Sequence, residues 1–510
     1  MLLLATAALL SLWFFRQNFK DGTIWMLATY VGVGLMLWTN YEAVSADHQQ
    51  ALPKIVRDFM LLGMVGFVQS LAVAKRINIA TAVVIIFTLF AGAYFLQEMM
   101  EEDGQQGLTI EQTIAPVTLA DDAELLVEVA SPAGARALQR LADMNNWILQ
   151  PAFSPKDLNS TDLDDYYTLD VMDVAGAEQL LAATKGVEYF EPNEEVSVYP
   201  FMKTAANHSE VSGQSLSIND PFADQQWSMR VLNMNDYYRA LESVQPVRKA
   251  KIAILDTGVD GKHEDISDNY FSIETKYDDD PMGHGTHCAG IAAGVTNNGI
   301  GIGSLAGNND EAYVQITSVK VLNAAGMGTQ KSIIAGIIEA TDEGADVISL
   351  SLGGPSNGSR QKAYSAAVKY AHDHGAIVVA AAGNSNLDAY NYAPANATGM
   401  ITVAALDEYL LRAPFSNKVD RLERGIAAPG VAIYSTTPNS TYKAYSGTSM
   451  ACPFVAGLLG VMKSINPDLS AAEAYDIING TGRDVQDGTA TGRVVQPAEA
   501  IRAMALPALY

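Results

Sequence analysis

The chain has 510 residues, of which 49% are hydrophobic, and a formal net charge of −25 at pH 7. This length allows two or three domains, including one with a core of about 250–300 residues. The negative charge argues against binding nucleic acid through its phosphates, so no nucleic-acid partner is expected. The charge fits an acidic enzyme surface as well as a saline setting.

The first hundred residues contain four apolar stretches, which are Leu2–Phe15, Ile24–Trp38, Met60–Ala74 and Ile77–Leu96. Only the last reaches the ~20 residues that cross a bilayer untilted. The stretches are nearly free of charge and carry aromatic residues at their ends, which favours an all-α transmembrane region of about four helices over residues 1–100, anchored in a lipid bilayer. The alternative for Leu2–Phe15 is the apolar part of a signal peptide.

The basic residues between these stretches predict an orientation. Arg16 and Lys20 lie in the first connection, and Lys75 and Arg76 lie in the third, whereas Gln97–Asp103 after the fourth stretch is acidic and lacks Lys and Arg. Placing the first and third connections in the cytoplasm puts the rest of the chain on the extracytoplasmic side.

Residues 120–200 are predicted to form a small α+β domain with a ferredoxin-like order of elements. The predicted strands are Glu124–Val129, Trp147–Phe153, Tyr166–Val171 and Val187–Val198, and the predicted helices are Pro132–Asn145 and Gly176–Thr184. Residues 201–218 are polar and turn-rich, which is typical of a linker open to proteolytic processing.

Residues 219–510 alternate short apolar runs with helical stretches, which predicts a doubly wound α/β domain with a largely parallel sheet. The predicted strands are Lys251–Leu255, Gln315–Leu322, Val347–Leu352, Ala376–Ala381 and Ile401–Ala404. The predicted helices are Thr286–Ala293, Gln330–Glu343, Ser359–His374, one that begins at Ser449, and Ser470–Asn479.

Three polar residues stand where these elements begin or end. Asp256 directly follows the strand Lys251–Leu255, and sites collect at the carboxyl ends of parallel strands. His284 lies between two glycines ahead of the helix Thr286–Ala293. Ser449 opens a helix, where the helix dipole and unpaired N–H groups favour developing negative charge.

This combination of residues indicates acyl transfer. Ser449 would attack a carbonyl, His284 would act as general base and acid, and Asp256 would hold the imidazole tautomer. A structural imidazole is the usual alternative for a single histidine, but it does not explain the three residues together. Asn384, after the run Ala376–Ala381, could donate to the oxyanion with the backbone N–H of Ser449; the alternative is a turn residue.

The segments DTGVD, HGTHCAG, AAGN and GTSMACP together resemble the motifs of the subtilisin family of serine endopeptidases, with a thermitase-like pattern over residues 219–505. The chain order Asp, His, Ser is also the order in that family. The resemblance implies a subtilisin-like fold and polypeptide substrates.

The resemblance also implies a cleft with two walls that holds the substrate as an added strand. One wall matches Ala325–Gly328 and assigns Gly326, Met327 and Gly328 to substrate binding. The other matches Val347–Pro355 and assigns Ser351, Leu352, Gly353 and Gly354. The alternative for both segments is an ordinary strand followed by a loop.

By the same resemblance, the α+β domain is an inhibitor-type propeptide whose tail, Glu188–Pro200, blocks the cleft until cleavage in the linker. The alternative is an independent α+β domain with another partner. Cleavage has two alternative outcomes: the protease leaves the membrane, or it stays bound to the propeptide.

A structural calcium ion is a further implication of the resemblance. Asp220, Asp265 and Asn298 match its ligands, and their oxygens suit calcium. Backbone carbonyls around Val295, Ile300 and Ile302 would complete the site, but the loop is one residue longer than the subtilisin pattern, and a glycine-rich turn without an ion is the alternative.

Other polar and sulfur-containing residues are expected to be structural. The acidic run Tyr277–Asp280 is interpreted as solvated surface. Cys288 and Cys452 are expected as small buried hydrophobic residues, with a disulfide as the alternative.

The sequence therefore predicts a membrane-anchored, self-maturing serine endopeptidase. The first alternative is a membrane scaffold or receptor whose protease-like domain binds peptides without turnover. The second is a protease that acts only on itself.

Overall fold

The computed structural model describes residues 118–120, 123–198, 202–204, 215–308, 311–356 and 361–505. All of them belong to one compact unit, Ile114–Tyr510. The four predicted transmembrane stretches lie outside the described residues.

Residues 123–198 begin with the predicted ferredoxin-like order of elements. These are β1 (Leu125–Val129), α5 (Pro132–Asn145), β2 (Ile148–Pro151), β3 (Tyr166–Asp170), α6 (Val174–Ala183) and β4 (Val187–Pro192). The four strands form an antiparallel sheet in the order β2-β3-β1-β4. The predicted last strand is shorter than expected, because the chain leaves this sheet at Pro192 and forms a separate strand, β5 (Glu195–Ser197).

Helix α5 shows why these residues form these elements. Ser131 caps it by accepting a hydrogen bond from the N–H of Gly134, and Pro132 follows at the first position, where no N–H is needed. The helix ends at Asn146, which adopts the left-handed conformation.

A six-stranded, all-parallel sheet forms the centre of the larger domain, in the order β10-β7-β12-β14-β16-β17. Its strands are β7 (Ala250–Asp256), β10 (Val314–Lys320), β12 (Val347–Leu350), β14 (Ile377–Ala381), β16 (Ile401–Leu406) and β17 (Gly425–Pro429). The sequence analysis predicted the first five. It missed β17, whose Gly-Ile-Ala-Ala-Pro sequence lacks an apolar run.

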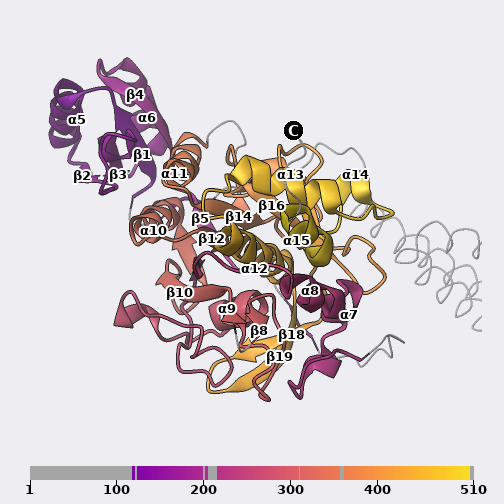
Figure 1. The fold of residues 1–510 in the computed structure, drawn as a ribbon. Helices are drawn as coiled ribbons and strands as arrows, with labels where there is room; N and C mark the ends of the chain where they lie inside the picture. Colours follow the sequence, from indigo (N-terminus) through magenta and orange to yellow (C-terminus); the bar gives the residue numbers. More distant parts are fainter. Residues whose placement is uncertain are drawn as a thin grey trace, which may run out of the picture. The chain divides into compact units, whose positions relative to one another are not determined.

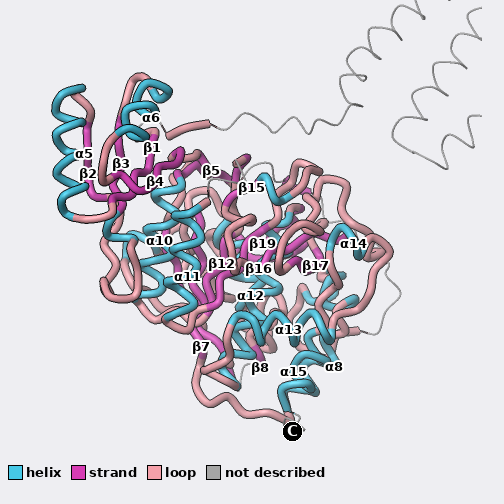
Figure 2. Tube along the Cα trace, turned by 90° about the horizontal axis from the view of Figure 1, so that it is seen from above, coloured by secondary structure: helices cyan, strands magenta, loops and turns pink. Residues whose placement is uncertain are grey.

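Helices cover both faces of this sheet, which confirms the predicted α/β class with a parallel sheet (Figure 1). Ile252 and Ile254 of β7 pack in one core cluster with the helices α9 (His284–Ala293) and α12 (Thr448–Ile465). Ala253 and Leu255 face a second cluster with α10 (Gln330–Asp342) and α11 (Lys362–Asp373), which lie side by side (Figure 2). Burial on both faces is characteristic of parallel strands.

Helices α9 and α12 pack against each other very closely. A Cβ atom on Gly457 of α12 would lie 2.6 Å from the carbonyl oxygen of Ala292 in α9. Glycine therefore lets the two helices approach, and this contact brings their N-terminal ends to the same edge of the sheet.

Shorter elements complete the described chain. The further strands are β6 (Met202–Thr204), β8 (Gly307–Asn308), β9 (Glu311–Ala312), β11 (Met327–Thr329), β13 (Gly354–Pro355), β15 (Tyr392–Ala393), β18 (Ile433–Thr437) and β19 (Thr441–Ser446). The further helices are α7 (Trp227–Val231), α8 (Met234–Leu241), α13 (Ala471–Thr481), α14 (Gly488–Thr491) and α15 (Pro497–Ala505). Within the ranges given above, α12 is the one helix long and apolar enough to span a bilayer, and it is buried in the core.

Candidate active site

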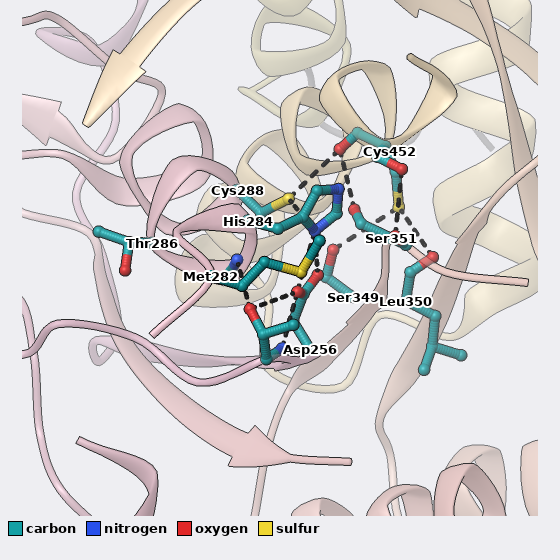
Figure 3. A network of polar contacts seen from close by, with 12 residues as sticks. Asp256, Met282, His284, Thr286, Cys288, Ser349, Leu350, Ser351 and Cys452 are labelled. Carbon is teal, nitrogen blue, oxygen red and sulfur yellow. Dashed lines mark hydrogen bonds and ion pairs between the residues drawn. The ribbon is translucent and has the colours of Figure 1, made fainter. Parts of the chain in front are cut away.

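Strand β7 and helix α9 bring Asp256 and His284 into direct contact. Nδ1 of His284 lies 2.9 Å from each carboxylate oxygen of Asp256, and both side chains are fully buried (Figure 3). Because a carboxylate can only accept, Nδ1 carries the proton, and in the neutral ring Nε2 is the acceptor. A Cβ atom on Gly285 would lie 2.1 Å from the carbonyl oxygen of Gly258, so this contact requires glycine after the histidine.

Ser449 is the second residue of α12 and is held by its neighbours. Its Oγ donates a hydrogen bond of 3.1 Å to the carbonyl of Ser351, at the end of β12. Its own carbonyl has no intrahelical donor four residues later, because that position is Pro453. The carbonyl instead accepts from Ser351 Oγ at 2.9 Å and from Cys288 Sγ at 3.4 Å.

Cys288 connects the serine to the histidine. Its Sγ lies 4.0 Å from Nδ1 of His284 on the same helix, while it also donates to the carbonyl of Ser449 (Figure 3). The structure thus brings Asp256, His284 and Ser449 together through contacts among β7, α9, β12 and α12.

Asn384 follows β14 and is oriented by Thr448, the residue before Ser449. Its Oδ1 accepts hydrogen bonds from the Thr448 N–H at 2.7 Å and from Thr448 Oγ1 at 2.9 Å. Thr448 Oγ1 in turn accepts from the N–H of Gly383 at 3.1 Å. These contacts fix which end of the Asn384 amide donates. The sequence analysis missed Thr448, although it stands inside the GTS motif.

The interpretation of Tyr277–Asp280 as solvated surface is wrong for its two ends. Tyr277 and Asp280 are each 5% exposed. Asp280 lies beside the Asp256–His284 pair, where its carboxylate accepts hydrogen bonds from Thr257, Gly283 and Thr286. A carboxylate four residues before a glycine-flanked histidine was the signal that could have indicated this position.

The two predicted substrate walls lie on either side of strand β5, from the end of the α+β domain. Strand β11 pairs with β5 in antiparallel fashion, with Gly328 opposite Val196. On the other side, Ser197 and Gly353 exchange two backbone hydrogen bonds of 3.0 and 2.9 Å. The N–H of Val198 donates to the carbonyl of Gly326 at 3.2 Å. The segment 195–198 thus adds a strand between the walls.

Of the remaining predicted wall residues, Gly354 and Met327 also lie against β5. Gly354 allows close approach, because a Cβ atom there would lie 2.6 Å from the carbonyl oxygen of Glu195. Met327 is opposite Ser197 in β11, and Leu352 is 3% exposed in the second core cluster. Ser351 contacts Ser449, as described above.

The α+β domain also contacts the first turns of α10 and α11. The buried carboxylate of Glu191 accepts from the N–H groups of Lys362 and Ala363 at 3.0 and 3.1 Å. Oδ1 of Asn193 accepts from the N–H of Lys331 at 3.0 Å. Negatively charged and polar acceptors at these positions satisfy unpaired helix N–H groups.

A second group of predicted residues meets at the loop after α9. The carboxylate of Asp220 accepts from the N–H groups of Asn297 and Asn298 at 2.7 and 3.0 Å. The carboxylate of Asp265 accepts from Nδ2 of Asn298 at 3.0 Å and from the N–H of Ile302 at 2.8 Å. Burial, with a smaller contribution from the charge of Asp220, raises the pKa of Asp265 to about 8. Two buried carboxylates with an adjacent amide suit a hard cation such as calcium.

Both cysteines have free thiols and are fully buried, so the predicted environment is confirmed and the disulfide alternative is wrong. Burial raises the pKa of Cys452 to about 11 and the pKa of Cys288 well above its usual range. Both therefore remain thiols at neutral pH.

Comparison with known proteins identifies the family. Residues 248–495 match the model of the Subtilase family. Thermitase of Thermoactinomyces vulgaris is 45% identical over 244 residues, which are 46% of this chain and 83% of thermitase. Subtilisin DY of Bacillus licheniformis is 39% identical over 257 residues, which are 49% of this chain and 89% of the relative.

Fervidolysin of Fervidobacterium pennivorans, a keratinolytic enzyme related to subtilisin, shares the fold. Its crystal structure matches with a TM-score of 0.61 and 23% identity, covering 76% of this chain and 62% of fervidolysin. The structural likeness shows the fold, while the identities to thermitase and subtilisin DY, over most of their length, show the family. The chain therefore belongs to the subtilase family of serine endopeptidases.

Proposed function

We propose that this chain is a membrane-anchored, self-maturing endopeptidase that uses Asp256, His284 and Ser449 as its catalytic triad. The observation that carries the proposal is the buried His284–Asp256 contact beside a serine at a helix N-terminus. In this reaction Ser449 Oγ turns from the carbonyl of Ser351 towards Nε2 of His284, which takes its proton as the carbonyl is attacked. Asp256 holds the ring and stabilises the imidazolium that forms.

Asn384 is proposed as the oxyanion donor, with the backbone N–H of Ser449 as the second donor. The contacts of its Oδ1 with Thr448 support this role, because they leave Nδ2 as the end that can donate. A donor of this kind typically contributes about 10²–10³ in turnover. Thr448 then acts as a positioning residue.

The α+β domain of residues 120–200 is proposed as a propeptide that inhibits the enzyme. The proposal is supported by the strand pairing of β5 with both cleft walls, which is how an extended substrate would bind. The same pairing supports substrate binding by Gly326, Met327, Gly328 and Gly353. The fold likeness to fervidolysin covers 76% of this chain, whereas residues 219–510 make up only 292 of its 510 residues. The likeness therefore extends to residues before 219.

The propeptide tail also favours processing in the adjacent linker. Val198 pairs with Gly326 of one predicted wall, and β6 (Met202–Thr204) pairs with Ala444–Ser446, which end three residues before Ser449. The described residues on both sides of 199–201 are thus paired with the protease domain near the proposed nucleophile. We propose that the first maturation cut falls between Val198 and Met202, at the start of the predicted linker.

Calcium is proposed as a structural ion at Asp220, Asp265 and Asn298. It would supply positive charge to two buried carboxylates, which otherwise cost free energy when ionised. Removing calcium with a chelator should then lower the unfolding temperature, and Asp265→Asn should abolish the difference between calcium-loaded and chelated protein. An equal response to chelator in the variant would contradict the site.

The membrane anchor is proposed on the apolar stretches of residues 1–100, with the protease outside the cytoplasmic membrane. One experiment tests anchoring and maturation together. Wild type and Ser449→Ala, each tagged at both ends, are expressed in membranes and followed by immunoblot. The wild type should give a shorter C-terminal fragment while the variant stays at full length. The same fragment from the variant would refute Ser449 as the nucleophile.

The cell fraction that contains the fragment shows whether the mature protease leaves the membrane. A fragment in the soluble fraction means that maturation releases the protease, whereas a fragment in the membrane fraction means that it stays bound to the propeptide. An added peptide substrate separates a general endopeptidase from a protease that acts only on itself, because only the former cleaves it.

A further inference from the structure

Asp280 carries a buried carboxylate to which the proposed mechanism gives no role. Its Oδ1 accepts from Thr257 Oγ1 and from the N–H of Gly283, each at 2.8 Å, and from the N–H of Met282 at 3.2 Å. Its Oδ2 accepts from the N–H and Oγ1 of Thr286, each at 2.8 Å. Five donors from three segments thus converge on one carboxylate that is 5% exposed.

These donors lie next to Asp256 and His284, the two members of the proposed triad that must stay aligned. Gly283 and Thr286 flank His284 in the first turn of α9, so Asp280 holds the backbone on both sides of the histidine. Thr257 directly follows Asp256, and its N–H donates to Asp256 Oδ1 at 2.7 Å. Asp280 therefore connects the end of β7 with the start of α9.

Thr257 is the link between the two aspartates. Its hydroxyl has one proton, and the shorter contact is with Asp280, at 2.8 Å against 3.2 Å for Asp256. The same oxygen accepts from the N–H of Gly285 at 3.2 Å. The Thr257 hydroxyl thus links the strand that carries Asp256 to the helix turn that carries His284.

The charge of Asp280 also affects the pKa of nearby groups. It contributes to the raised pKa of Cys288 on α9 and of Tyr445 on β19, both of which are raised chiefly by burial. A second negative charge beside Asp256 favours the imidazolium that forms during the reaction. A fixed buried anion costs free energy unless it is fully hydrogen-bonded, and here it is.

We propose that Asp280 is a positioning residue for catalysis, which holds His284 against Asp256 through Gly283, Thr286 and Thr257. This inference rests on the proposed triad. A small displacement of a catalytic group can cost about 10²-fold in rate. The expected loss therefore falls on kcat, because the substrate walls at β11 and Gly353 receive none of these hydrogen bonds.

The test compares Asp280→Asn and Asp280→Ala with wild type on a soluble peptide anilide. Active sites are counted with a fluorophosphonate, so that kcat refers to reactive enzyme only. The asparagine variant keeps the shape but loses acceptors and charge, and we expect a kcat about 10-fold lower with KM within about twofold. The alanine variant should lose about 100-fold. The acid limb of kcat/KM should move to lower pH by about 0.5–1 unit in Asp280→Asn.

Asp279→Asn is the matched control, because it removes the same charge one residue away. Asp279 is 71% exposed in its side chain and pairs with Lys320 at the surface. This variant should keep the wild-type kcat and pH profile. If the Asp280 variants do not fold, Thr257→Val removes only the hydroxyl link and should lower kcat about 5- to 10-fold.

The outcomes distinguish a failure of the positioning role of Asp280 from a failure of the proposed triad. Wild-type kcat per active site and an unshifted acid limb in Asp280→Asn, or in Thr257→Val where Asp280→Asn does not fold, would overturn the positioning role. Activity that survives in Ser449→Ala would instead overturn the proposed triad itself, whatever the Asp280 variants do.

Discussion

The two helices that carry the proposed triad begin differently from α10 and α13, which only support the fold. Helices α10 and α13 each start with a capping box, built on Thr329 and Ser470. Helices α9 and α12 start after Gly283 and Gly447, and neither has a side-chain cap of its own. Helices α10 and α13 thus satisfy the N–H of their third residue with their own cap, whereas the first turns of the triad helices donate to side chains outside the helix.

This difference explains how the site is assembled. The first turn of α9 donates to Asp280, and the first N–H of α12 donates to Asn384, so both helix starts are fixed by tertiary contacts. A local cap would place a side chain where the scissile carbonyl must approach. Glycine leaves that space open, and the acceptors then come from outside each helix, which are Asp280 before α9 and Asn384 after β14. Four predictions concern these helices.

The largest effect is expected from Ser449→Ala, on a triad helix. Loss of the nucleophile should lower kcat by about 10⁶-fold, because the remaining triad members cannot act without it. The unfolding temperature should stay close to that of wild type, since the hydroxyl makes one hydrogen bond to Ser351. Steady-state kinetics with protein purified free of other proteases checks the first point, and calorimetry checks the second. Measurable turnover with the same pH profile as wild type would show that another group is the nucleophile.

A smaller loss is expected from Asn384→Ala, which removes the partner of the first N–H of α12. The kcat should fall by about 10²–10³-fold with little change in KM, because the donor acts on the transition state. Thr448→Val should give a part of this loss by freeing the amide to rotate. An Asn384→Ala effect on KM alone would mean that the amide binds substrate and does not stabilise the oxyanion.

The locally determined parts of the fold could be predicted from the sequence. Helix α5 was placed at the bounds that the structure shows, where Ser131 caps its start and Pro132 is its first residue. The buried strands β7 and β14 were evident as apolar runs that end in Asp256 and near Asn384. The proposed triad residues could be named because Asp256 ends such a run and His284 and Ser449 stand where helices begin.

The tertiary contacts could not be predicted in this way. Asp280 lies in an acidic run that reads as surface, and its burial depends on donors from β7 and α9. Thr448 was passed over because its role appears only when β14 lies beside α12. Strand β17 carries small residues and is held in place by its neighbour β16. The partners of Thr448 and of β17 are more than 20 residues away, and so is Thr257, one of the donors to Asp280. Neither periodicity nor capping gives a signal over that distance.

A third prediction concerns His287, which lies one turn after His284 on α9. It stacks on Tyr445 with 4.4 Å between ring centroids and Nε2 donates to the Lys443 carbonyl at 3.0 Å. Burial lowers the pKa of His287 to about 3, while the unfolded chain titrates near 6.5. The unfolded state therefore binds more protons below pH 6.5, and the stability due to the neutral ring is lost as pH falls through this window.

The expected size is about 3 kcal/mol between pH 6.5 and pH 4. His287→Gln keeps a donor for Lys443 but does not titrate, so its stability should fall less steeply over this range. Denaturant unfolding in the Ser449→Ala background avoids self-digestion during the measurement. Parallel slopes for the two proteins would show that other groups cause the acid sensitivity.

The smallest effect is expected at a supporting helix. Ser470 accepts from the N–H of Glu473, and Glu473 accepts from the N–H of Ser470, so the cap of α13 is complete within four residues. Ser470→Ala should cost about 1 kcal/mol of stability, or about 2 °C in unfolding temperature, and leave kcat unchanged. Ser470→Asp, which keeps an acceptor, should recover most of the loss. If Ser470→Ala lowered kcat in the folded enzyme, the difference between the self-capped helices α10 and α13 and the triad helices would fail. A helix's own cap would then be setting the geometry of the site.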